Sequence, residues 1–99
     1  MPNHPAIIES DFFCDLLAET MHDMRTETGL SKNQVATNSN VSPQMVGYVE
    51  TKARRPGIDI FVRMTRGKGR LPSEVMAETE KRAGWSRGPG GELVFTSVK

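Results

Sequence analysis

The strongest constraint on the fold of this chain is a pair of helix N-cap signals, Ser31 and Ser42, set eleven residues apart. A serine hydroxyl can accept a hydrogen bond from an unpaired amide of the first helical turn. Pro43 follows Ser42 directly, and proline at the first helical position sacrifices no hydrogen bond. Asn40 lies where the chain must reverse, and asparagine tolerates the left-handed conformation. This stretch therefore predicts two short helices joined by a tight turn.

Apolar residues support both short helices. Val35 and Ala36 give the first helix a small contact face, whereas Val46 and Val49 place an apolar stripe on the second. Two short helices joined in this way are typical of a helix-turn-helix. The second helix of such a unit has the size that enters a DNA major groove.

The region from Ser10 to Ala83 resembles the Cro/C1-type (XRE-like, lambda-repressor-like) helix-turn-helix family of bacterial and phage repressors. The residues that match the family pattern are Gly29, Leu30, Ser31, Val35, Ala36, Val41, Ser42, Val46, Val49, Glu50 and Pro56. Three positions depart from it: Lys32 replaces a glutamine, Asn40 replaces the turn glycine, and Ser39 replaces a core leucine or valine. The packing beneath the turn is therefore expected to be thinner than usual. The resemblance implies an all-α, five-helix DNA-binding domain.

The chain before the motif is expected to form an arm and one long helix. Residues 1–9 are interpreted as a flexible arm, because Pro2 and Pro5 discourage a helix. Apolar residues with a 3.6-residue period predict a helix over residues 10–28, and Gly29 is expected to end it.

Two further helices are expected after the motif. One spans residues 58–66 and the other starts at Pro72 and stops near Gly84. The residues of the first that are expected to face the core are Ile58, Phe61, Val62 and Met64. These helices complete a predicted DNA-binding domain over residues 10–84.

Residues 85–99 form a C-terminal extension of different character. Its glycine-rich part, residues 88–91, predicts a turn or a flexible segment. Residues 92–98 are β-prone, and a lone strand is not stable in water. This strand must therefore pair with its own domain, pair with a second copy of the chain, or stay disordered.

The net charge of +1 hides a segregation of charge along the sequence. Residues 1–30 contain six acidic residues and one basic residue, whereas residues 31–72 contain eight basic and two acidic residues. Because phosphate binding depends on the face presented rather than on the total charge, the local excess favours a nucleic-acid surface. The acidic first helix is expected to lie away from the duplex.

The resemblance implies that the second helix of the motif contacts bases. The residues expected to do so are Pro43, Gln44, Met45 and Tyr48. Gln44 is the strongest candidate, because a glutamine amide can pair with adenine N6 and N7 in the major groove. The alternative interpretation is a polar helix face that contacts only water.

A second group of residues is expected to hold the DNA backbone. The predicted phosphate contacts are Lys32, Asn33, Ser42, Lys52, Arg54 and Arg55. Free amides at helix starts and closely spaced cations both attract phosphate. Of the remaining cations, some are expected to flank the same backbone and others to be simply exposed; these are Arg63, Arg66, Lys68 and Arg70.

Arg25 and Glu50 match an ion pair that joins the first helix to the end of the third in the resembled family. Two unpaired surface charges are the simpler alternative. If the pair is buried, removing one partner would cost about 3–5 kcal/mol.

Catalysis, metal binding and membrane insertion find little support in the sequence. The single cysteine, Cys14, cannot form an internal disulfide, and the two histidines show no metal-ligand spacing. No apolar run approaches the roughly 20 residues that span a bilayer. We therefore expect a cytoplasmic protein that is not an enzyme and uses no cofactor.

The favoured functional hypothesis is a transcriptional regulator, expected to be a repressor that binds a palindromic operator as a homodimer. One short helix reads few base pairs, so two copies on half-sites about 34 Å apart are expected. The expected dimer residues are Val75, Met76, Trp85, Leu93 and Phe95. One alternative is an antitoxin that represses its own operon and binds a toxin through its tail. Another is a protein-interaction module that does not bind DNA.

Overall fold

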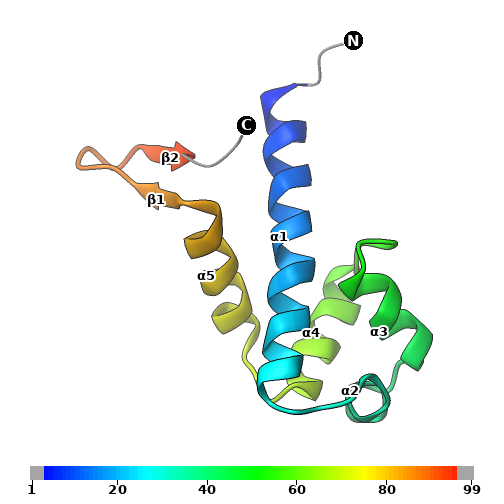
Figure 1. Ribbon diagram of the computed structural model, residues 1–99. Helices are drawn as coiled ribbons and strands as arrows, with labels where there is room; N and C mark the ends of the chain where they lie inside the picture. The colour runs from blue at the N-terminus through cyan, green and yellow to red at the C-terminus, as the bar shows by residue number, and fades with distance from the viewer. Residues whose placement is uncertain (1–3, 96–99) are drawn as a thin grey trace.

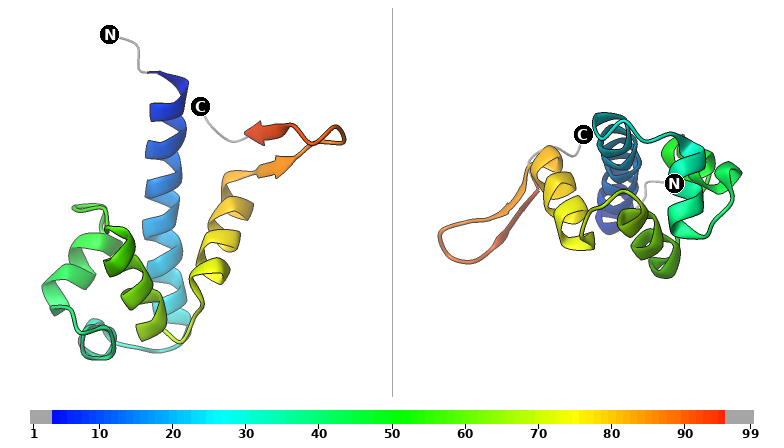
Figure 2. Two further views of the ribbon diagram at one scale, coloured as in Figure 1. Left: turned by 180° about the vertical axis from the view of Figure 1, so that it is seen from behind. Right: turned by 90° about the horizontal axis from the view of Figure 1, so that it is seen from below.

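The computed structural model describes residues 4–95 as five helices followed by a β-hairpin (Figure 1). The elements are α1 (Pro5–Glu27), α2 (Lys32–Ser39), α3 (Pro43–Glu50), α4 (Ile58–Gly67), α5 (Pro72–Ala83), β1 (Trp85–Arg87) and β2 (Leu93–Phe95). Both views in Figure 2 place α2 and α3 on one side of α1, and α5 with the hairpin on the other. The expected fold class, an all-α helix-turn-helix domain with a short β-stranded tail, is therefore confirmed.

The long helix α1 starts earlier than the sequence suggested. It begins at Pro5, and the His4 ring nitrogen Nδ1 accepts a 3.0 Å hydrogen bond from the Ala6 amide. The expectation of a flexible arm over residues 1–9 is wrong for residues 5–9, which are helical. Pro5 occupies the first helical position, where proline favours a helix instead of breaking it. Residues 1–3 lie outside the described part of the chain.

The helix-turn-helix forms where its capping residues predicted it. Ser31 and Gln34 form a reciprocal capping box, with hydrogen bonds of 2.7 Å and 3.1 Å between backbone amides and side-chain oxygens. The Ser42 hydroxyl accepts a 3.0 Å bond from the Met45 amide at the start of α3. Asn40 adopts the left-handed conformation between the two helices, with φ 55° and ψ 46°. Each of these local predictions is confirmed.

The core lies between α1 and the four shorter helices. Its buried apolar residues are Leu17, Met21, Met24, Val35, Ala36, Val46, Val49, Phe61, Met64 and Val75. Two residues of α4 that were expected to face this core do not: Ile58 is 76% exposed and Val62 is 42% exposed. They lie one helical turn apart on the side of α4 turned away from Phe61 and Met64, so that prediction is wrong.

The tail folds back on its own chain. Strands β1 and β2 pair antiparallel, with Trp85 opposite Phe95. The Trp85 ring stacks on Phe13 of α1 at 4.7 Å between ring centroids and meets Phe95 edge-on at 5.0 Å. The strand predicted over residues 92–98 is thus present as β2, and it pairs with β1 of the same chain. Residues 96–98 of that prediction lie outside the described residues.

Candidate nucleic-acid interface

The start of α3 is open to solvent. Pro43 and Gln44 are exposed, whereas Val46 and Val49 are buried in the core. The remaining two candidates for base contact, Met45 and Tyr48, are half-buried, and Met45 packs against the core. Gln44 is therefore the candidate whose polar group is most available to a partner.

Lys32, the first residue of α2, lies alongside α3. A Cβ atom placed on Gly47 would come within 3.8 Å of the Lys32 Nζ atom. Neighbouring Asn33 and the cap residue Ser42 are both exposed. Lys32 therefore places a cation beside α3, and free backbone amides at the starts of α2 and α3 also favour an anion.

The basic loop, residues 51–57, is folded against α1. Lys52 Nζ bonds to Glu19 Oε2 at 2.8 Å, and Arg55 Nη2 bonds to Asp11 Oδ1 at 2.7 Å. These hydrogen bonds raise the pKa of both cations. Arg54 instead lies over the Tyr48 ring, 5.0 Å from its centroid.

These loop contacts link the acidic and basic parts of the sequence. The side chains of Lys52 and Arg55 remain 42% and 57% exposed, and their carboxylate partners are about as open. Exposed ion pairs contribute little stability, so such cations can exchange one anionic partner for another. The cations could be identified from the sequence, but their contacts on α1 could not be predicted.

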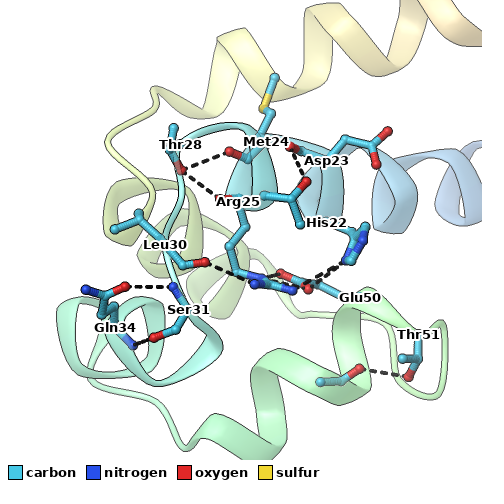
Figure 3. A network of polar contacts seen from close by, with 12 residues as sticks. His22, Asp23, Met24, Arg25, Thr28, Leu30, Ser31, Gln34, Glu50 and Thr51 are labelled. Carbon is cyan, nitrogen blue, oxygen red and sulfur yellow. Dashed lines mark hydrogen bonds and ion pairs between the residues drawn. The ribbon is translucent and has the colours of Figure 1, made fainter.

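Arg25 and Glu50 form a buried ion pair between α1 and the end of α3 (Figure 3). Arg25 Nε donates to both Glu50 carboxylate oxygens, at 3.0 Å and 2.9 Å. Arg25 Nη1 also donates to the Leu30 carbonyl at 3.0 Å. Sequence reasoning missed His22, whose Nδ1 atom lies 3.2 Å from Glu50 Oε1. Its spacing of three residues before Arg25 was the available signal, because such residues share one helix face.

Lys68 is not part of the basic surface. It is 2% exposed, and its Nζ atom is buried with no hydrogen-bond partner. Burial lowers the pKa of Lys68 to about 8, while Glu50 raises it and Arg25 lowers it. The prediction that Lys68 is an exposed or phosphate-flanking cation is wrong. A count of charges along the sequence cannot show that one of them points into the core.

Val75 is equally unavailable to a partner molecule. It is fully buried in the core, so its predicted place in a dimer surface is wrong. Met76 is half-buried and packs against the core as well. The hairpin residues differ, because Leu93 is 59% exposed and Phe95 is 38% exposed.

Residues 4–95 contain no group of three or more His, Cys, Asp or Glu side chains that could hold a metal ion. Within the same residues, no helix has the length and apolar character needed to cross a membrane.

Comparison with known proteins supports the fold. No protein-family model matches the chain, and no curated protein matches it. A search of solved structures finds the restriction-modification controller protein C.AhdI from Aeromonas hydrophila, with a TM-score of 0.60 and 23% sequence identity. The similarity covers 67% of this chain and 97% of the controller protein. The two chains therefore share an architecture, to which this chain adds further residues.

Proposed function

We propose that this protein is a sequence-specific DNA-binding regulator that inserts α3 into the major groove. The observation that carries this proposal is the position of Gln44, exposed on the first turn of a short helix whose opposite face is buried. In helix-turn-helix proteins the N-terminal residues of the second helix contact base edges. Gln44 would pair with adenine, and Pro43 would touch a neighbouring base.

The groups around α3 suit the phosphate backbone. Lys32, Asn33 and Ser42 lie at the starts of α2 and α3, where amides and helix dipoles add to the attraction. Arg54 on the basic loop is free of carboxylate partners among the described residues. Lys52 and Arg55 would exchange Glu19 and Asp11 for phosphates on binding; these contacts set register and orientation.

A homodimer would double the short reading surface. The hairpin offers Leu93 and Phe95 as exposed apolar residues, and it lies on the opposite side of α1 from α3 (Figure 2). A two-fold axis near the hairpin would therefore keep the two α3 helices apart, as half-sites one helical turn apart require. Trp85 would hold Phe95 in place, because its ring packs against both Phe95 and Phe13 of α1.

The comparison adds support for a regulatory role. The structural neighbour is a controller protein, and the similarity to this chain covers 97% of that protein. Repression by occupation of a promoter requires nothing more than a DNA-binding domain. An operator with two-fold symmetry would match the dimer.

Selection of bound sequences from a random duplex library tests the proposal. Gln44→Ala should relax the selected motif at one base position per half-site, with a loss of about 1–3 kcal/mol there. Asn33→Ala is the matched control, because losing a phosphate contact weakens binding to all sequences without changing the motif. An unchanged motif with Gln44→Ala would refute the assigned base contact, and no enrichment with the wild-type protein would refute DNA reading.

A further inference from the structure

The turn between α2 and α3 is stabilised by polar contacts from α4. Ser39 is 4% exposed and occupies a position where an apolar residue was expected to fill the core. Asn40 follows in the left-handed conformation. The last carbonyls of a helix have no partner within the helix and need donors from elsewhere. This turn therefore depends on what α4 supplies.

Arg63 supplies those donors. Its Nε atom donates to the Ser39 carbonyl at 3.1 Å, and its Nη2 atom donates to the Asn40 carbonyl. A guanidinium presents its donors in a rigid planar fork, so two bonds from one side chain fix direction as well as distance. A cation at the C-terminus of α2 also complements the helix dipole.

Close contact between the backbones of α2 and α4 completes this arrangement. A Cβ atom on Gly67 would lie 2.0 Å from Ser39 Oγ and 3.1 Å from the Val35 carbonyl, so only glycine fits there. The Asn38 side chain donates to the Gly67 carbonyl at 3.2 Å. The helices α2 and α4 are thus joined at two successive turns of α4, by Arg63 and by Gly67.

We propose that Arg63 is a positioning residue that sets the orientation of α3 for DNA reading. This inference rests on the proposed function. Only Val41 and Ser42 separate Asn40 from the first residue of α3, so a shift of the turn must move the start of that helix. Gln44 lies on this first turn. Arg63 therefore acts through the backbone of the turn and not by contact with DNA.

Arg66 provides a matched control on the same helix. It lies three residues after Arg63 and is exposed, and its side chain forms no hydrogen bond or ion pair with the described residues. Arg66→Met removes the same charge from nearly the same place without removing a hydrogen bond to the turn. Arg63→Lys keeps the charge but loses the fork, so comparing it with Arg63→Met separates geometry from charge.

The experiment measures affinity of the full chain for its selected operator and for random duplex, over a range of salt concentrations. For both Arg63→Met and Arg63→Lys we expect operator affinity to fall about tenfold, the size of effect typical of a charged hydrogen bond. Affinity for random duplex and the salt dependence should stay close to wild type with Arg63→Lys. Arg66→Met should match the wild type in preference for operator over random duplex.

A second readout uses the free protein, so it does not depend on DNA binding. Amide chemical shifts of Asn40, Val41 and the first turn of α3 should change in both Arg63 variants and stay unchanged in Arg66→Met. Wild-type operator affinity in Arg63→Lys would overturn the proposal. Amide shift changes that are confined to α4 would also overturn it. A third contrary result is a salt slope that falls by about one unit with Arg63→Met and is unchanged with Arg63→Lys, because that pattern indicates a direct phosphate contact. If the wild-type protein does not bind DNA but the amide shifts change as expected, the proposed function is refuted, and the role of Arg63 in positioning the turn is not.

Discussion

Two ion pairs of similar length play different roles in this protein. Arg25 and Glu50 meet at 2.9 Å with side chains only 10% and 1% exposed, whereas Lys52 and Glu19 meet at 2.8 Å with side chains 42% and 50% exposed. Burial, and not distance, decides the consequence of losing a partner. A buried charge left alone is costly, while an exposed one returns to water. The first pair therefore belongs to the architecture, and the second belongs to a surface that can change partners.

The largest effect on stability is expected from removal of the buried carboxylate of Glu50. Glu50→Gln should lower the free energy of unfolding by about 3–5 kcal/mol, because Arg25 would keep its buried charge without compensation. Lys68, which Glu50 also stabilises in its charged form, adds to the loss. Urea denaturation measures the effect.

The matching exposed carboxylate provides the control. Glu19→Gln removes the partner of Lys52 and should leave the free energy of unfolding close to that of the wild type, because the charge of Lys52 returns to water. Equal losses from the two substitutions would show that burial does not distinguish these pairs.

A second prediction concerns Lys68, the buried cation close to Arg25 and Glu50. Lys68→Met should raise the free energy of unfolding at about pH 7 by about 1–3 kcal/mol, because a buried unpartnered ammonium is replaced by an apolar side chain of similar length. A pKa lowered from 10.5 to about 8 means that the folded protein releases this proton at lower pH than the unfolded chain. Between those values the unfolded state binds more protons, so wild-type stability gains from rising pH.

The advantage of Lys68→Met should therefore shrink as pH rises from about 8 towards 10.5. Thermal or urea unfolding of both proteins across this range, taken as a difference, removes the contributions of the other titrating groups. If the difference in free energy of unfolding between the two proteins stays constant with pH, burial does not lower the pKa of Lys68.

The smallest predicted effect concerns the exposed pairs. Replacing both carboxylate partners of the basic loop, Asp11→Asn with Glu19→Gln, should tighten DNA binding by about three- to tenfold, because exposed ion pairs are weak and their loss frees two cations for phosphate. Filter binding or fluorescence anisotropy at low salt measures this. The double variant Glu27→Gln with Glu80→Gln removes the same number of negative charges from carboxylates that form no ion pair with the described residues. We expect it to give a smaller gain in DNA affinity. Weaker binding in the first variant would indicate that the pairs preorganise the loop.

Local signals in the sequence predicted the helix-turn-helix well. Capping by Ser31 and Ser42, and the left-handed Asn40, depend on side chains that bond within a few residues, so the local sequence determines them. The same reasoning failed for Pro5, since proline both ends and starts helices and the sequence did not show which. The placement of Gln44 on an exposed face followed from the spacing of Val46 and Val49.

Long-range contacts could not be predicted in this way. Sequence patterns predict Val75 at a dimer surface and Lys68 as an exposed or phosphate-flanking cation, yet both residues are buried. Charge counting predicts Arg63 as one of several cations that flank the DNA backbone or are exposed, whereas its side chain donates to carbonyls more than twenty residues earlier in the chain. Burial of a charge depends on how helices pack, and neither composition nor periodicity reports that.

The most direct test of the central claim, that Gln44 on α3 reads a base, is a double-mutant cycle between protein and DNA. Wild type and Gln44→Ala are titrated with the selected operator and with the same duplex changed at the base pair assigned to Gln44. The account predicts a coupling of about 1–3 kcal/mol, so that the base change weakens binding by wild type and hardly affects the variant. Equal losses in both proteins, which make the two changes additive, would contradict it.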